Sequence, residues 1–83
     1  MTHVHGLVLD NRDNPVENAT ITIPAVGKFA LSGEDGTFVI QDVPSSLYRI
    51  NVIHRHFQKF SADVRLLEDT DIIINLDQNA FGY

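Results

Sequence analysis

The sequence predicts an all-β fold, specifically a seven-stranded antiparallel Greek-key sandwich, and three observations lead to this prediction. Apolar and polar residues alternate with a period of two along most of the 83-residue chain, as in strands with one buried face. No window of a dozen residues shows the apolar spacing of an amphipathic helix. Turn-forming residues separate seven short segments at intervals of about ten residues, which is typical of two packed antiparallel sheets.

The first predicted strand covers residues 3–10 and shows how turns delimit the strands. Within it, Leu7 and Leu9 share the outer face with two histidines, and the core face carries valines. Residues 10–15 then end the strand, because Asp and Asn bond to their own backbone in turns and proline has no N–H to donate. The other strands are predicted over residues 19–23, 28–32, 37–41, 48–52, 60–66 and 72–77.

Turn residues also predict how consecutive strands connect. Gly33 and the Asp35-Gly36 pair indicate a hairpin between the third and fourth strands, since Asp-Gly readily adopts the positive φ values of tight turns. Pro44 and the serines after it lead out of the fourth strand. The inward faces form the predicted core, which consists of Val4, Val8, Ile21, Ile23, Phe29, Phe38, Ile40, Tyr48, Ile50, Val52, Val64, Ile72, Ile74 and Leu76.

The composition excludes several classes of site and partner. The chain has no cysteine, so it has no disulfide and no thiolate ligand or nucleophile. Its net charge of -5 argues against binding to nucleic acid. No uninterrupted apolar run is longer than three residues, and Met1 is not followed by the basic and apolar segments of a leader. We therefore expect no membrane insertion and no signal peptide in this chain.

The length predicts one domain, over residues 1–77, followed by an irregular tail at residues 78–83. A domain excised from an exported parent carries no signal of its own, so these residues leave the localisation unknown. The charges are unevenly distributed, because residues 45–66 hold four of the six basic residues and only one of the eleven acidic ones. This part of the chain is therefore basic, and the remainder is acidic.

Two His-x-His pairs raise the hypothesis of a metal site. His3 with His5, and His54 with His56, each place two imidazoles on one face of a strand, with Cα atoms about 6.6 Å apart. The first pair lies opposite the core face of its strand, whereas the second continues the core face as its strand ends. No carboxylate flanks either pair. We predict no metal and no other cofactor. The spacing of the acidic clusters does not match an EF-hand calcium loop, and turns require Asp and Asn at these positions in any case.

Two groups of residues are candidates for contact with a protein partner or with a second copy. The first is the basic strand end VIHRHFQKF at residues 52–60, and its candidate residues are His54, Arg55, His56, Phe57 and Lys59. The second is a set of large apolar residues with outward parity, namely Leu7, Leu9, Val39, Ile53 and Ile73. If contiguous, this set marks a contact surface. The alternatives are that its members are scattered, or that the tail with Phe81 and Tyr83 covers some of them.

The spacing of core and turn residues resembles a known family. The matching segments are V-x-G-x-V-x-D at residues 4–10, N-P-V-x-N-A-x-I-x-I at 14–23, D-G-x-F-x-I at 35–40, V-P at 43–44 and Y-x-I-x-V at 48–52. Over residues 3–76 they resemble the carboxypeptidase regulatory-like domain. The resemblance implies a transthyretin-like (prealbumin-like) sandwich and a non-enzymatic accessory domain that supports folding, spacing or contact in exported or cell-surface proteins. One departure is His56, which stands where that family commonly has a glycine.

Catalysis is not predicted. No serine lies in a nucleophile elbow or has a histidine and a carboxylate evidently placed for a triad. The transthyretin-like hydroxyisourate hydrolase shares the sandwich but ends in Tyr-Arg-Gly-Ser, whereas this chain ends in Phe-Gly-Tyr. A carbohydrate-binding role stays open as an alternative. Stacking on sugar rings needs exposed aromatic side chains, and those not assigned to the core are Phe57, Phe60, Phe81 and Tyr83.

Overall fold

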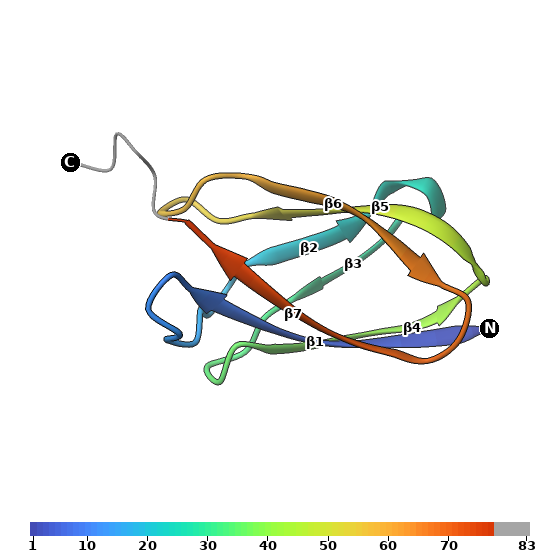
Figure 1. Ribbon diagram of the computed structural model, residues 1–83, viewed down its shortest axis with the longest axis horizontal. Coiled ribbons are helices and arrows are strands. Elements are labelled where there is room, and N and C mark those ends of the chain that lie inside the picture. The colour runs from blue at the N-terminus through green and yellow to red at the C-terminus, as the bar shows by residue number, and fades with distance from the viewer. Residues whose placement is uncertain (78–83) are drawn as a thin grey trace.

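The structure, a computed structural model, describes residues 1–77, and these residues form seven strands (Figure 1). The strands are β1 (Thr2–Asp10), β2 (Thr20–Ile23), β3 (Lys28–Leu31), β4 (Thr37–Val43), β5 (Ser46–Ile53), β6 (Phe60–Leu66) and β7 (Thr70–Leu76). They form a three-stranded sheet in the order β4-β1-β7 and a four-stranded sheet in the order β3-β2-β5-β6. A short 3₁₀ turn, η1 (Pro24–Val26), joins β2 to β3.

The predicted strands and the sandwich are confirmed, but one strand pair contradicts the prediction that the fold is antiparallel throughout. β1 and β7 are parallel, with Val4 aligned with Thr70 and Asp10 aligned with Leu76. The other pairs are antiparallel. Alternation of apolar residues fixes the faces of a strand but not its direction relative to a distant neighbour. The chain crosses from one sheet to the other between β6 and β7, and this path sets the direction of β7 (Figure 1).

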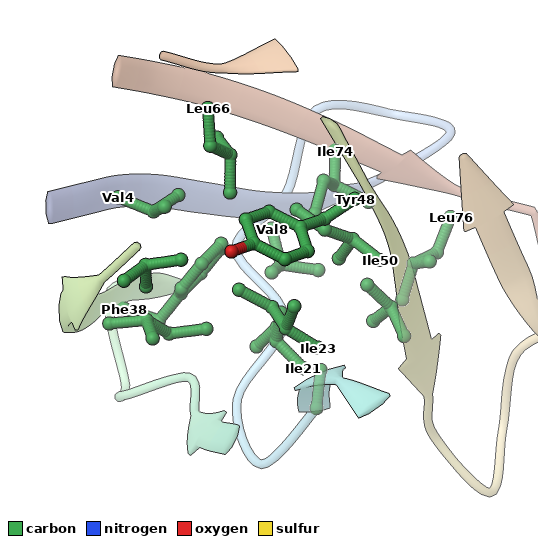
Figure 2. Packing of buried hydrophobic residues seen from close by; sticks show 14 of the residues in the cluster. Val4, Val8, Ile21, Ile23, Phe38, Tyr48, Ile50, Leu66, Ile74 and Leu76 are labelled. Atoms are coloured by element: carbon green, nitrogen blue, oxygen red, sulfur yellow. The ribbon is translucent and has the colours of Figure 1, made fainter. Parts of the chain in front are cut away.

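The core lies between the two sheets, and most of the predicted core residues are buried in it. Figure 2 shows the Tyr48 ring in the middle of this cluster, and its hydroxyl donates to the carbonyl oxygen of Pro44 at 2.5 Å. The buried tyrosine therefore satisfies its polar atom without leaving the core. Val64 and Ile72 are only half-buried and pack against the cluster. The list of predicted core residues omitted four apolar residues that are also buried: Val16, Ala19, Val43 and Leu66.

Phe29 is the predicted core residue that the structure places outside, with 67% of its surface exposed. In the β2–β3 pair, Phe29 is aligned with Thr22 and Ala30 is aligned with Ile21. Aligned residues of an antiparallel pair point to the same face, so the buried Ile21 brings Ala30 inward and leaves Phe29 outward. Hydrophobicity alone favours the larger side chain for the core, and the register of β3 overrides it.

No helix within residues 1–77 has the length and apolar character that crossing a lipid bilayer requires.

Candidate functional site

The outer face of the three-stranded sheet brings together three of the predicted contact residues. Leu7 of β1 is aligned with Ile73 of β7, and Leu9 lies two residues further along the same face of β1. Ile73 is 67% exposed, whereas Leu7 and Leu9 are half-buried. Val39 lies in the neighbouring row, aligned with His5, and is also exposed. Leu7, Leu9 and Ile73 are thus neighbours on one face, which we call the β1–β7 face. Ile53, the remaining residue of the predicted outward set, lies on the four-stranded sheet, so the set as a whole is not contiguous.

The β5–β6 turn holds the candidates of the basic strand end, and His54 has a structural role there. The backbone N–H of His56 donates to Nδ1 of His54 at 3.1 Å, and Nε2 of His54 lies 3.0 Å from the carbonyl oxygen of Glu17. Because Nδ1 accepts from a backbone N–H and the group facing Nε2 is a carbonyl oxygen, Nε2 is the nitrogen that donates to the Glu17 carbonyl oxygen. The Phe57 ring meets His54 edge-on, with 5.1 Å between ring centroids, and packs against the core. The histidine therefore ties the turn to the segment before β2.

The exposed side chains of this turn are basic. Arg55, His56 and Lys59 are exposed, whereas His54 and Phe57 are half-buried. The backbone N–H of Phe57 donates to the carbonyl oxygen of His54 at 3.2 Å and closes the turn. His56 is not among the described non-glycine residues that have a positive φ. The turn therefore needs no left-handed residue at this position, which explains why a histidine can stand where the resembled family commonly has glycine.

The two His-x-His pairs lie apart and do not form a joint metal site. His3 and His5 are on β1 in the three-stranded sheet, whereas the other pair follows β5 in the four-stranded sheet. The backbone N–H of Asp42 donates to His3 Nδ1 at 3.3 Å, and both ring nitrogens of His54 are in hydrogen bonds with the protein. Residues 1–77 contain no group of three His, Asp or Glu side chains that could hold a metal ion.

Two acidic side chains in the turns form hydrogen bonds within their own turns. The backbone N–H groups of Asn14 and Arg12 donate to Asp10 Oδ1 at 2.9 and 2.8 Å, and they hold the pKa of Asp10 below its usual range. The hydroxyl and backbone N–H of Thr37 donate to Asp35 Oδ1 at 2.7 and 3.0 Å and lower the pKa of Asp35 in the same way. These contacts support the interpretation of both aspartates as turn residues.

The serines that form side-chain hydrogen bonds have structural partners. Ser32 is buried; its hydroxyl donates to the carbonyl oxygen of Val16 at 2.6 Å and accepts from the backbone N–H of Ala19 at 2.9 Å. The Ser61 hydroxyl donates to Asn51 Oδ1 at 2.6 Å. Neither hydroxyl is bonded to a histidine, the most common base for a serine nucleophile.

The outer face of the four-stranded sheet carries an apolar group of which sequence reasoning identified only Ile53. Thr20 of β2 lies between Leu31 of β3 and Ile53 of β5, and Phe29 is aligned with Thr22 in the next row. Phe29, Leu31 and Ile53 are 67%, 57% and 51% exposed. The sequence of β2 could have predicted this group. Thr20 and Thr22 alternate with buried isoleucines and therefore face outward, so the residues aligned with them on the neighbouring strands also face outward. The prediction missed the group because it assigned Phe29 to the core.

The comparisons with known proteins concern a family and several folds. The sequence profile of the carboxypeptidase regulatory-like domain matches residues 3–77. No curated protein sequence matches the chain. A chain of a mutant type II cohesin–X-dockerin complex from Acetivibrio cellulolyticus has a similar fold, with a TM-score of 0.81 and 19% identity. The match covers 100% of this chain and 64% of that one.

Two further solved structures share the fold at lower similarity. A putative carbohydrate binding protein from Bacteroides uniformis matches with a TM-score of 0.69 and 13% identity, covering 90% of this chain and 40% of that one. The 3-chlorocatechol 1,2-dioxygenase from Rhodococcus opacus matches with a TM-score of 0.70 and 9% identity, covering 94% of this chain and 59% of that one. This chain thus corresponds to only part of each structure, and the low identities show a shared fold alone.

Proposed function

We propose that this chain, which belongs to the carboxypeptidase regulatory-like domain family, is a non-enzymatic accessory module that makes a protein contact through its β1–β7 face. The module would serve structural support or contact within a larger exported or cell-surface protein or assembly, as the resemblance implies. The partial coverage of the similar structures supports the view that such a sandwich occurs as one part of longer chains. The proposed module neither binds nucleic acid nor inserts into a membrane.

The observation that carries the proposal is the alignment of Leu7 with Ile73 on the outer face of the three-stranded sheet. Leu9 extends the apolar row along β1, and Ile73 is the most exposed of the three. Burying an exposed isoleucine side chain fully against a partner stabilises a complex by about 1.5–3 kcal/mol. Contiguous exposed apolar residues of this kind mark contact surfaces more often than single ones do.

The basic turn is the second part of the proposed contact surface. Its exposed side chains are Arg55, His56 and Lys59, while His54 and Phe57 hold the turn in place. Exposed cations at the end of a sandwich steer an acidic partner and set its orientation more than they add affinity. The turn would therefore orient a partner whose apolar part binds the β1–β7 face.

Charging Ile73 tests the proposal. In a pull-down from an extract of the source organism, we expect partners retained by the wild-type protein to be reduced about tenfold or more by Ile73→Glu. The matched control is Ile53→Glu, an exposed isoleucine on the other sheet, which we expect to retain the same partners. Thermal melting checks that both variants are folded. Equal retention by Ile73→Glu and the wild type, or loss with Ile53→Glu instead, contradicts the proposed face.

Carbohydrate binding is the second candidate function, and the exposure of Phe29 favours it. This ring lies beside a depression of about 410 Å³ that is also lined by Lys28, Val39 and Gln41. An exposed aromatic ring next to polar side chains suits stacking and hydrogen bonding to a sugar. In a titration with soluble oligosaccharides, we expect amide chemical shifts to move at Phe29 and Gln41 and to stop moving in Phe29→Ala. Unchanged spectra at millimolar saccharide contradict it.

A further inference from the structure

The outer edge of β6 is an unprotected strand edge. β6 is the last strand of the four-stranded sheet and, within residues 1–77, pairs with β5 alone (Figure 1). The register with β5 runs without a break from Ser46–Leu66 to Val52–Phe60. β6 is seven residues long and contains neither proline nor glycine. Such an edge presents a regular row of backbone donors and acceptors on which another strand can pair, and proteins usually interrupt it.

The core is also open beneath this edge. A cavity of about 190 Å³ lies between β6 and β7, and its lining consists of Ile50, Phe60, Ala62, Val64, Ile72, Ile73 and Ile74. Phe60, Val64 and Ile72 pack against the core yet stay half-buried, because no strand covers them on this side within the described residues. A strand added to β6 would bring an apolar side chain over the cavity and cover these residues.

We propose that β6 pairs with β6 of a second copy of this chain, antiparallel and two-fold symmetric, in the register centred on Val64. Aligned residues of an antiparallel pair share a face, so the symmetric registers centre on Ala62, Asp63 or Val64. Centring on Val64 aligns Asp63 with the other copy's Arg65, twice. Centring on Asp63 would align two carboxylates with each other, and centring on Ala62 would leave Arg65 without an acidic neighbour.

The local contacts fit this arrangement. Asp63 and Arg65 are both exposed on the outer face of β6. Asp63 already has one cation near it, since Arg49 Nε lies 3.2 Å from Asp63 Oδ1, and a carboxylate accepts from more than one donor. On the inner face, the two Val64 side chains would meet at the symmetry axis over the open core. Apolar contact thus supplies the affinity, and the charges select the register.

The other strand edges are less suited to a second copy. β3 has only four residues. The register of β4 with β1 shifts between Thr2 and Val4, near Asp42 with its φ of 59°, which marks a bulge. The outward residues of β7 carry an acid, Asp71, and no cation to match it. β6 is therefore the edge that combines regular geometry with self-complementary charge, and pairing there would join two four-stranded sheets into one.

Charge complementation between two variants tests the proposal. In sedimentation velocity, we expect the wild type to show a concentration-dependent dimer, and Arg65→Glu and Asp63→Lys each to raise its dissociation constant about tenfold or more. When the two variants are mixed, every cross-copy pair is again of opposite charge, so we expect the dimer to return. Arg12→Glu is the matched control, a charge reversal on an exposed loop residue away from β6 that should leave the dimer unchanged.

Three outcomes would each overturn the proposal. The wild type could stay monomeric up to about 1 mM, either single variant could dimerise as strongly as the wild type, or the mixture could fail to dimerise. A cysteine test does not depend on the charge variants. The chain has no cysteine, so Val64→Cys should form a cross-linked dimer under mild oxidation, because residues aligned with themselves have Cα atoms about 4.5–5.5 Å apart. Ala62→Cys, about 13 Å from its symmetry mate in this register, should not.

This surface differs from the β1–β7 face, and the two proposals can fail separately. They share only Ile73, which lines the cavity beside β6 and is also exposed on the outer face of β7. The variants at Asp63, Val64 and Arg65 leave Ile73 unchanged, so their dimerisation reports on the edge alone. If Ile73→Glu loses partner retention but still dimerises, the β1–β7 face and the β6 edge act separately. If the edge variants lose the dimer but still retain partners, the same conclusion follows from the other side. Cross-linking of Ala62→Cys at the rate of Val64→Cys would overturn the register proposed here.

Discussion

Replacing Gly6 with alanine is expected to lower the free energy of unfolding by about 3 kcal/mol. Gly6 of β1 is aligned with Phe38 of β4, and the phenyl ring lies directly over the glycine. An added Cβ would fall 2.0 Å from Phe38 Cζ and 2.1 Å from Cε1, far inside van der Waals contact. The ring is only 4% exposed, so it can move only by disturbing the packed core. Urea unfolding followed by circular dichroism measures the loss.

The control for this prediction is Gly33→Ala in the β3–β4 turn. The nearest atom to an added Cβ there is Asp35 Oδ1 at 3.5 Å, an ordinary contact, and we expect a change within about 0.5 kcal/mol. Phe38→Leu in the Gly6→Ala background should recover part of the lost stability, because the smaller side chain vacates the space. If the two changes are additive instead of compensating, the ring over Gly6 is not the cause of the loss.

Replacing Ile74 with alanine is expected to lower the free energy of unfolding by about 3 kcal/mol, whereas Ile73→Ala should change it by less than about 0.5 kcal/mol. Ile74 is 3% exposed and is aligned with the fully buried Val8, so truncation leaves a cavity in the core. Ile73, its neighbour, is 67% exposed. The two positions differ only in the face of β7 that they occupy, which makes each a matched control for the other.

Thermal or urea unfolding of both isoleucine variants measures this difference. A larger loss for Ile73→Ala would show that β7 is shifted by one residue, because such a shift exchanges the two faces of a strand. Equal losses at the two positions would contradict the assignment of the buried face to Ile74. The same variants also separate stability from contact. Ile73→Ala should weaken partner retention while leaving the unfolding transition in place, since the proposed β1–β7 face uses Ile73 and the core does not.

Much of the fold follows from local patterns that the sequence displays directly. Strong alternation at Tyr48, Ile50 and Val52 predicted β5 and its buried face, and all three residues are in the core. Gly36, in the predicted hairpin turn, has the expected positive φ of 80°. These features depend on neighbouring residues alone, so they do not require knowledge of which strands pair.

The errors come from the direction and register in which strands pair. The parallel β1–β7 pair joins strands from the two ends of the described chain, and no turn signal specifies its direction. Phe29 is outside because β3 pairs with β2 in a register that turns Ala30 inward. Leu66, at the end of β6, and Val43, at the end of β4, are buried although the prediction did not include them. The neighbouring strand, and not the residue itself, thus decides the direction of β7 and the burial of these side chains.

For the candidate surfaces too, some properties were predictable from the sequence and others required the structure. The parity of Leu7 and Ile73 was enough to predict that both face outward, but their contiguity depends on the β1–β7 alignment. His54 continues the inward face of β5 in the sequence, and only the structure shows that its ring binds the backbone of Glu17. The irregular tail predicted at residues 78–83, with Phe81 and Tyr83, lies outside the described residues.

The sequence by itself determined that the chain forms strands, where they begin and end within a few residues, and which face of most strands is buried. These properties follow from side-chain alternation and turn chemistry, which act over a few neighbouring residues. Only the tertiary structure decided that Leu7 and Ile73 form one surface, that Phe29 is exposed, and that the edge of β6 is open. Those properties depend on which strands pair and in which register, which the alternation within a single strand does not specify.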